Sequence, residues 1–212
     1  MEKTISPLEQ RVLGVLVEKE MTTPDYYPLT LNSMTLACNQ KSNRRPVVDF
    51  SETDVMDGFD RMRRLGFVMP ASSESGRVPK FRHCLVEELH LEPEYLAILC
   101  ELLLRGGQTT GELRTRAERM HPFKDLAAVE YALDELQQRE PPLVKKLERQ
   151  PGQKECRYIH LFGEDTEEVQ TELTVNHPHP TRDERIEALE RGVAELREEL
   201  LSLKSQLKDL LD

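Results

Sequence analysis

The chain of 212 residues has no tryptophan, few aromatic residues (5%) and only four cysteines. With so few aromatic rings, any core is built mainly from leucine, valine, isoleucine and methionine. Zinc sites and disulfide frameworks use closely paired cysteines, and no C-x-x-C pair occurs in this sequence. We therefore expect no metal site, and buried free thiols at Cys38, Cys84, Cys100 and Cys156.

Long hydrophobic runs are also missing. The aliphatic stretch at residues 12–17 is far too short to span a bilayer. Acidic residues at positions 2, 9, 18 and 20 do not suit a signal peptide. We expect a cytoplasmic protein with no membrane partner.

The sequence contains none of the common catalytic motifs. It has no phosphate-binding Gly-rich loop, no H-E-x-x-H and no G-x-S-x-G. His177 and His179 form an H-x-H pair without an evident third metal ligand. Glu18 and Glu20 are expected near the end of an exposed helix. The sequence predicts a protein that is not an enzyme and that uses no cofactor.

Charge is distributed unevenly along the chain, whose formal net charge is −10. Residues 1–90 and 91–163 each carry one more acidic than basic side chain, whereas residues 164–212 carry eight more. The acidity therefore belongs to the tail. A global pI of about 5.2 does not exclude nucleic-acid binding by the rest of the chain.

The most informative pattern is a duplication. Three amphipathic helical segments followed by a two-stranded hairpin occur twice, and the hairpins close on the related phrases KFRHCL (80–85) and RYIHLF (157–162). This order is typical of winged-helix domains, which bind nucleic acid or protein. We predict a mainly α fold with small β-hairpins (α+β), in which two tandem winged-helix domains (1–90 and 91–163) precede a C-terminal coiled-coil helix. His83 and His160 occupy matching positions, which predicts a structural or surface role common to both copies.

Helix boundaries follow from capping and apolar spacing. Ser6 with Glu9, Ser51 with Asp54, and Thr109 with Glu112 form N-terminal capping pairs, and Asp125 caps a further helix. Apolar residues recur at three- and four-residue intervals behind these caps. The first predicted helix begins at Ser6 and gives way to a loop over residues 21–29, which contains Pro24 and Pro28. The other predicted helices cover residues 31–38, 52–64, 93–105, 109–118 and 126–139. The predicted strands cover residues 67–69, 78–85, 143–147 and 155–161.

The third helix of each copy argues against reading DNA in the usual way. In a helix-turn-helix this helix enters the major groove, but its acidic residues here repel phosphates: Glu52, Asp54, Asp57 and Asp60 in the first copy, and Glu130, Asp134 and Glu135 in the second. Basic residues elsewhere form a candidate nucleic-acid surface, namely Lys41, Arg44 and Arg45 in an insertion and Arg77, Lys80 and Arg82 on the first wing. The alternative is that these are ordinary solvated charges.

A second candidate surface is rich in tyrosine and amide side chains. It comprises Tyr26, Tyr27, Asn32, Asn39, Gln40 and Asn43. Such a loop can recognise a peptide or single-stranded nucleic acid by hydrogen bonding and stacking. Alternatively, the amides satisfy backbone groups in a long irregular loop.

The tail contains an acidic linker (164–180) and then a heptad pattern (181–212). β-Branched residues at two "a" positions and leucine at every "d" position favour a parallel two-stranded coiled coil. We expect a homodimer through this helix, although the helix could instead fold back onto its own domains. The dimerisation residues would be Ile186, Leu189, Val193, Leu196, Leu200, Leu203, Leu207 and Leu210.

Several phrases resemble the YceH family of bacterial proteins of unknown function. They are SPLEQRVLG (6–14), TPDYYPLTLNS (23–33), ACNQKSNR (37–44), RVPKFRH (77–83), LLRG (103–106) and GELRTR (111–116). The resemblance covers about residues 5–162. It implies tandem winged-helix domains and carries over no activity and no catalytic residue. Where the family pattern reads Asn-Arg-Asp-Pro, this chain has Arg45 in place of the aspartate, which makes the loop more basic.

Two roles follow from these observations. The first is a dimeric regulator that contacts nucleic acid through wings and basic loops. The second is a protein–protein adaptor that uses a winged-helix scaffold without DNA binding, because a fold does not dictate a function.

Overall fold

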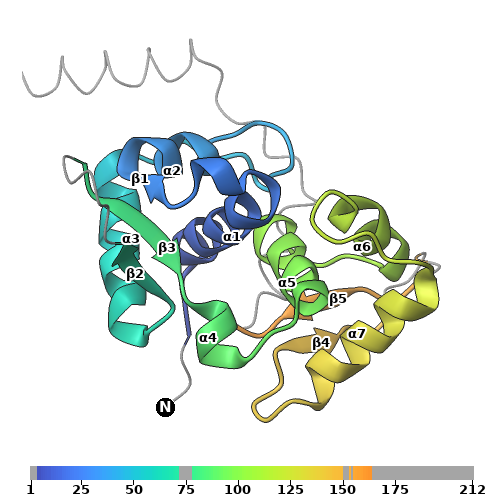
Figure 1. The fold of residues 1–212 in the computed structure, drawn as a ribbon. Coiled ribbons are helices and arrows are strands. Elements are labelled where there is room, and N and C mark those ends of the chain that lie inside the picture. The colour runs from blue at the N-terminus through green and yellow to red at the C-terminus, as the bar shows by residue number, and fades with distance from the viewer. Residues whose placement is uncertain (1–3, 72–77, 150–152, 154, 164–212) are drawn as a thin grey trace, which may run out of the picture. The chain divides into compact units, whose positions relative to one another are not determined.

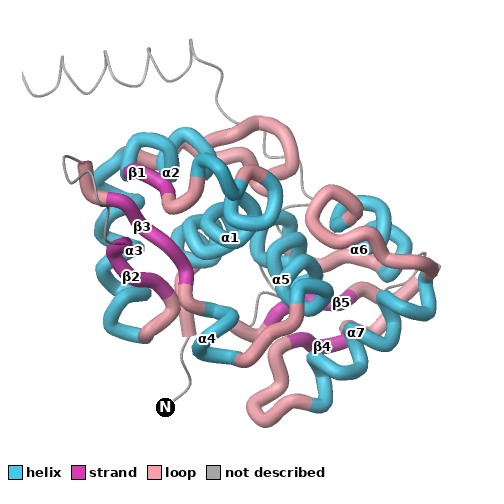
Figure 2. Tube along the Cα trace, in the orientation of Figure 1, coloured by secondary structure: helices cyan, strands magenta, loops and turns pink. Residues whose placement is uncertain are grey.

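The computed structural model describes residues 4–71, 78–149, 153 and 155–163 (Figure 1). The described residues belong to one compact unit that combines helices with small antiparallel sheets (Figure 2). None of the described helices is long and apolar enough to cross a membrane. The predicted linker (164–180), the predicted coiled coil (181–212) with its eight dimerisation residues, and Arg77 lie outside the described residues.

The first repeat contains three main helices, α1 (Pro7–Thr22), α2 (Leu31–Cys38) and α3 (Glu52–Leu65). Three strands, β1 (Leu29–Thr30), β2 (Val68–Ala71) and β3 (Lys80–His83), form an antiparallel sheet. β3 is the central strand, so the order is β1-β3-β2. Two short helices, η1 (Pro24–Tyr26) and α4 (Leu85–Leu89), complete the repeat.

The second repeat has the same order of elements. Its helices are α5 (Pro93–Arg105), α6 (Thr110–Ala117) and α7 (Leu126–Gln138), followed by the antiparallel pair β4 (Val144–Lys146) and β5 (Tyr158–His160). Gln108 forms an isolated bridge to Tyr158, in the position that β1 takes beside β3 in the first repeat. The duplication predicted from the sequence is therefore present in the order of helices and strands.

The predicted capping pairs are all present. Ser6, Ser51 and Thr109 each accept a hydrogen bond from the backbone N–H three residues later, and the acidic side chain at that position returns a bond to the cap. Asp125 caps α7 in the same manner, although without the returned bond. Because these caps satisfy N–H groups that a helix leaves unpaired, they fix where each helix begins.

Several boundaries in the structure differ from the sequence-based ones, and the strand predicted over residues 155–161 covers only Tyr158–His160. Helix α1 continues to Thr22, into the segment predicted to be a loop, because the Thr22 hydroxyl bonds the carbonyl of Glu18 at 2.7 Å. The strand predicted over residues 78–85 ends at His83, where the backbone N–H of Leu85 donates to Nδ1 of His83 at 3.2 Å and the chain turns into α4.

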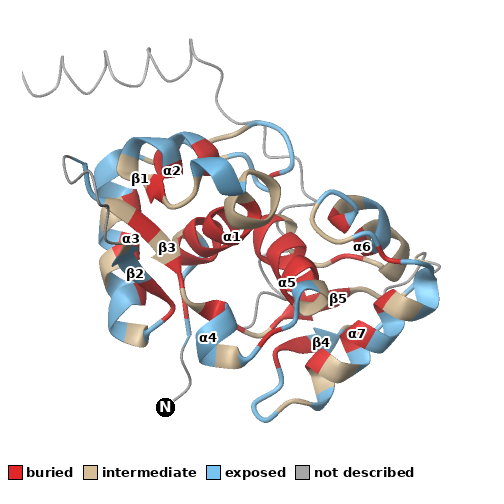
Figure 3. Cartoon of the chain, viewed as in Figure 1, coloured by how far each residue is buried: buried red, intermediate tan, exposed pale blue. Residues whose placement is uncertain are grey.

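Both repeats share one hydrophobic core whose centre is the crossing of α1 and α5 (Figure 3). Here the thiol of Cys100 donates to the carbonyl oxygen of Gly14, with 3.3 Å between sulfur and oxygen. The two residues are equivalent: each follows the proline that opens its helix by the same number of positions. The two repeats therefore contact each other through equivalent positions of their equivalent first helices, α1 and α5. Of the four cysteines, all of which are free, Cys38 and Cys100 are buried and Cys84 and Cys156 are half-buried.

Gly14 permits this crossing, and we expect that Gly14→Leu lowers the free energy of unfolding by about 1–3 kcal/mol. A β-carbon at this position would lie 2.9 Å from Cδ2 of Leu104 and 3.1 Å from Cβ of Leu103. Urea denaturation measures the change. The matched control is Gly111→Leu, because a β-carbon at position 111 meets nothing within 4 Å. Equal loss of stability in the two variants would contradict the close approach.

Candidate functional site

An irregular segment, residues 39–50, connects α2 to α3 and is called the clasp here. Asn39 holds both of its ends: its amide donates to the carbonyl of Phe50 at 2.8 Å and accepts from the N–H of Phe50 at 2.9 Å. The N–H of Arg45 donates to the carbonyl of Leu104 in the second repeat at 3.0 Å. The clasp therefore contacts both repeats.

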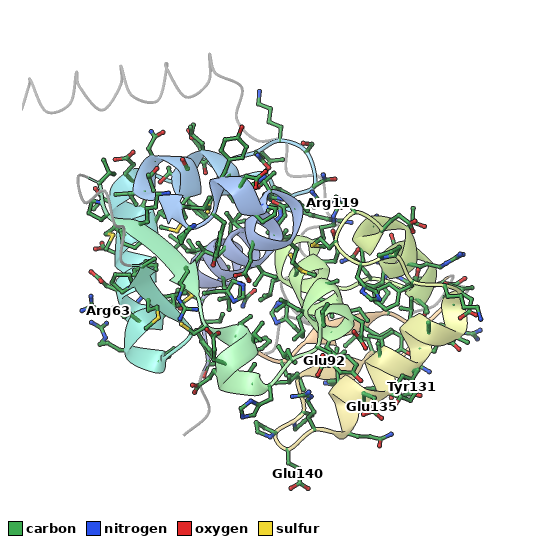
Figure 4. All side chains as sticks on the ribbon, viewed as in Figure 1. Arg63, Glu92, Arg119, Tyr131, Glu135 and Glu140 are labelled. Atoms are coloured by element: carbon green, nitrogen blue, oxygen red, sulfur yellow. The ribbon has the colours of Figure 1, made fainter. Side chains whose placement is uncertain are left out.

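The clasp is anchored by a buried ion pair. Both side chains, Glu18 of α1 and Arg44 of the clasp, are fully buried, and Nη2 of Arg44 lies 2.5 Å from Oε2 of Glu18. Arg119, between α6 and α7, pairs with the other oxygen of Glu18 (Figure 4). Burial alone would raise the pKa of Glu18, but the two arginines lower it to about 2. The sequence-based placement of Glu18 on an exposed helix is therefore wrong.

A second buried carboxylate extends this cluster. Glu101 of α5 is fully buried, with Oε2 lying 2.8 Å from Nε of Arg105 and Oε1 3.6 Å from Arg119. Arg105 also donates to the side chain of Asn43 in the clasp. We call Glu18, Arg44, Glu101, Arg105 and Arg119 the junction cluster. It joins four segments from both repeats. The one feature of the sequence that could have indicated this cluster is Glu101, a charged residue within the apolar run of α5.

A fourth arginine, Arg11 of α1, lies close to this cluster. Arg11 is buried and donates to the carbonyls of Cys38 and Pro46, at 3.0 and 2.6 Å. Burial, and then the positive charge of Arg44, lowers the pKa of Arg11 to about 10. Arg11 therefore holds the end of α2 and the middle of the clasp together through backbone carbonyls.

The six basic residues proposed to contact nucleic acid differ in burial and in their partners. Arg44 is committed to the junction cluster and faces no solvent. Arg82 lies 2.5 Å from the carboxylate of Glu87. The others are the exposed Lys41 and Arg45, the half-buried Lys80, and Arg77 outside the described residues. The structure leaves Lys41 and Arg45 as exposed cations on either side of a buried arginine.

The tyrosine and amide residues proposed to bind a partner also separate. The hydroxyl of Tyr27 accepts a hydrogen bond from the N–H of His83 at 2.8 Å, and burial raises the pKa of Tyr27. The remaining amides bond within the fold: Asn32 to Glu52, Asn39 to Phe50, Gln40 to Arg44, and Asn43 to Arg105. Tyr26 is 79% exposed, and Asn32 and Asn43 are exposed as well, although both of their amides are hydrogen-bonded within the fold. This geometry favours the structural alternative for the amides.

The repeated histidines share one role, as their matching positions predict. Nδ1 of His83 accepts from the N–H of Leu85, and Nδ1 of His160 accepts from the N–H of Phe162 at 3.3 Å. In both repeats the ring fixes the turn that leaves the last strand. Nε2 of His83 lies 2.5 Å from Glu20, whereas burial lowers the pKa of His160 to about 4.

The outward sides of α3 and α7 are acidic. On α3, Glu52, Asp54 and Asp57 are exposed, and Arg61 is paired with Glu9 at 2.5 Å. Arg63 and Arg64, also exposed, are confined to the last turn of α3. Acidic residues in the first turn and basic residues in the last turn complement the helix dipole, so part of this pattern stabilises the helix.

On α7 the acidic side also carries large apolar groups. Glu130 and Asp134 are exposed, and so are Leu126 (46%) and Tyr131 (63%). Leu126 is exposed because it is the first residue of α7 and lies at the edge of the buried side. The sequence analysis did not identify Tyr131 as a candidate. It lies outside the three- and four-residue spacing of the buried positions of α7, and this spacing could have indicated that it is exposed. We call Leu126, Glu130, Tyr131, Asp134 and Glu135 the α7 face.

No group of three or more metal-ligating side chains occurs within the described part of the chain. What the structure brings together instead is the junction cluster, which fixes the repeats against each other, and the exposed α7 face.

Comparison with known proteins places the chain in a family. A family model described as a protein of unknown function, DUF480, matches residues 5–153. A UPF0502 protein of Geotalea uraniireducens is 54% identical over 221 residues, covering 98% of this chain and 100% of the relative. A UPF0502 protein of Geobacter sulfurreducens is 54% identical over 202 residues (92% and 91%), and one of a Shewanella species is 44% identical over 216 residues (100% and 98%). The chain therefore belongs to the DUF480 or UPF0502 family of bacterial proteins, which is the YceH family predicted from its loops.

Proposed function

We propose that this chain is a tandem winged-helix protein of the cytoplasm that recognises a partner protein rather than catalysing a reaction. Each repeat has the three helices and β-hairpin of a winged helix. In such folds the third helix is the usual recognition element, so the chemistry of α3 and α7 indicates what is recognised.

The observation that carries this proposal is the α7 face. Glu130 and Asp134 lie beyond the first turn of α7, so the helix dipole does not account for them. Carboxylates at this place oppose DNA phosphates. Tyrosine is enriched at protein interfaces, so the exposed Tyr131 favours a protein partner, and the exposed Leu126 adds apolar surface beside it. The acidic residues in the first turn of α3 also repel DNA phosphates.

The junction cluster supports this role in a different way. It ties α1, the clasp, α5 and the α6–α7 connection together through buried charges. Fixed repeats present α3 and α7 in a constant relative arrangement. We propose that the predicted C-terminal coiled coil doubles this arrangement in a homodimer, which strengthens binding to a repeated partner.

Contact with nucleic acid is the second candidate, and one observation favours it. Lys41 and Arg45 are exposed at the surface of the clasp, and Lys80 is half-exposed on β3. Cations on loops and wings can track a phosphate backbone without reading bases.

A salt titration with duplex DNA of random sequence separates the two roles. For a protein-binding adaptor we expect no measurable affinity for the duplex at low salt. For the nucleic-acid role, the logarithm of the affinity falls with the logarithm of salt by about 0.9 per phosphate contact, and Lys41→Ala with Arg45→Ala reduces that slope by about 2. Fluorescence anisotropy of labelled duplex with the full chain measures both. Tight, steeply salt-dependent binding that these two substitutions weaken would overturn the proposal.

A further inference from the structure

The ring of Tyr131 lies near the centre of the outward side of α7. Its side chain is 63% exposed. Glu130 and Asp134 of the same helix are exposed. Glu135 is one helical turn beyond Tyr131 (Figure 4), and Asp134 and Glu135 share its side of the helix because they lie three and four positions further along. Val129, Ala132, Leu133 and Leu136 form the opposite, buried side. An aromatic ring surrounded by carboxylates on an exposed helix is therefore available to a partner.

The neighbouring ring of Tyr95 already has a cation of the same chain over it. The guanidinium of Arg139 lies over the Tyr95 ring, 5.7 Å from its centroid. The same guanidinium donates to the carbonyls of Leu89 and His90. Burial, and then the negative charge of Glu135, raises the pKa of Tyr95. Arginine over tyrosine beside carboxylates is thus already part of this fold.

Tyr131 has the same ring and the same kind of neighbours. Within the residues that the structure describes, no lysine or arginine lies over its ring. A cation over an aromatic ring is attracted to it, and carboxylates at the ring edge add charge-assisted hydrogen bonds. A guanidinium is planar, so it can stack flat on the ring and bond a carboxylate with two parallel N–H groups, whereas an ammonium is a point charge without this geometry.

We propose that the α7 face binds an arginine-bearing cationic segment of a partner protein, with one guanidinium stacked on Tyr131 and paired with Asp134 or Glu130. Charge complementarity selects this occupant: the face is acidic and repels both a nucleic-acid backbone and an acidic peptide. The inference rests on the proposed function and adds to it the chemistry of the partner.

The test uses the full chain and three labelled peptides of equal length, in which serine alternates with arginine, lysine or aspartate. We expect fluorescence anisotropy to show the order arginine, lysine, aspartate in affinity. Tyr131→Ala weakens binding of the arginine peptide about tenfold, and Tyr131→Phe keeps most of the affinity because the ring remains. Asp134→Asn with Glu130→Gln weakens binding of both cationic peptides.

The controls are an exposed apolar side chain and an exposed acid on other segments, Leu36→Ala on α2 and Glu118→Gln after α6. Both should bind the arginine peptide as the unaltered chain does, and thermal denaturation should show that all variants are folded. Equal affinity for arginine and lysine peptides, or equal loss in a control and in Tyr131→Ala, would overturn the inference.

The same variants separate this inference from the proposed function. A partner captured from a native lysate equally by the unaltered chain and by Tyr131→Ala overturns the α7 site and leaves the adaptor role standing. Binding of random duplex with the steep salt dependence described above overturns the adaptor role itself.

Discussion

Glu18→Gln is expected to lower the free energy of unfolding by about 3–5 kcal/mol, because it breaks a buried ion pair and leaves the partner charge uncompensated. Arg44 and Glu18 are both fully buried, and Arg119 also depends on this carboxylate. A neutral amide cannot balance two guanidinium groups. Urea denaturation followed by circular dichroism measures the change.

The control for this prediction is a surface pair within the same repeat. Glu87→Gln removes the partner of Arg82, where both side chains are substantially exposed, and we expect a loss below about 1 kcal/mol. Arg44→Met should destabilise nearly as much as Glu18→Gln. In the double variant the two losses should not add, because both residues serve one interaction. Additive or equally small losses would mean that the junction cluster does not hold the repeats together.

Acidification should destabilise the protein through His160. Burial lowers the pKa of His160 from 6.5 to about 4 in the folded chain, whereas the unfolded chain takes up a proton at the ordinary value. The stability from this neutral ring is therefore complete above pH 6.5 and is lost as the pH falls towards 4, by about 3 kcal/mol in total. Unfolding free energies measured at intervals across this range test the slope.

His160→Asn provides the decisive comparison. The asparagine oxygen can still accept the hydrogen bond from the N–H of Phe162, but it has no proton to gain. The variant should lose most of the slope between pH 6.5 and 4. His90→Asn is the matched control, because His90 is exposed and has a positive φ of 49° that asparagine tolerates. If His160→Asn keeps the full slope, another group is responsible.

A second decline is expected at lower pH. The pKa of Glu18 is lowered to about 2 in the folded chain, so the stability that its charge provides is present above the unfolded value near 4.5 and is lost below it. The two groups therefore act in adjacent windows, first His160 and then Glu18, and His160→Asn should remove only the upper one.

Much of the fold follows from local sequence, because its determinants are local. Ser6, Ser51 and Thr109 each find their capping partner three residues away, so the starts of α1, α3 and α6 could be read directly. The repeated phrases around His83 and His160 likewise predict a shared structural role, and both rings fix the same turn.

The candidate site was less accessible to sequence reasoning, because its contacts join distant segments. In the sequence Arg44 looks like a surface cation, but in the fold it pairs with Glu18, and the same carboxylate also binds Arg119 from the other repeat. The short helix α4 depends on a ring nitrogen that accepts a backbone bond. No periodicity encodes either contact. Tyr131 could have been found from its exposure on the helical wheel, but an outward tyrosine alone does not indicate a ligand.

Gly14 contacts its equivalent residue, Cys100, in the other repeat. In a symmetric dimer, equivalent surfaces of two chains contact each other in the same way, whereas here both belong to one polypeptide. In a true dimer a substitution at such a point appears on both sides at once. Here the two positions carry different residues, a glycine and a cysteine, and the cysteine thiol bonds the glycine carbonyl. Because both helices belong to one polypeptide, a substitution can change one side of this contact and leave the other as it is, which a symmetric dimer does not allow.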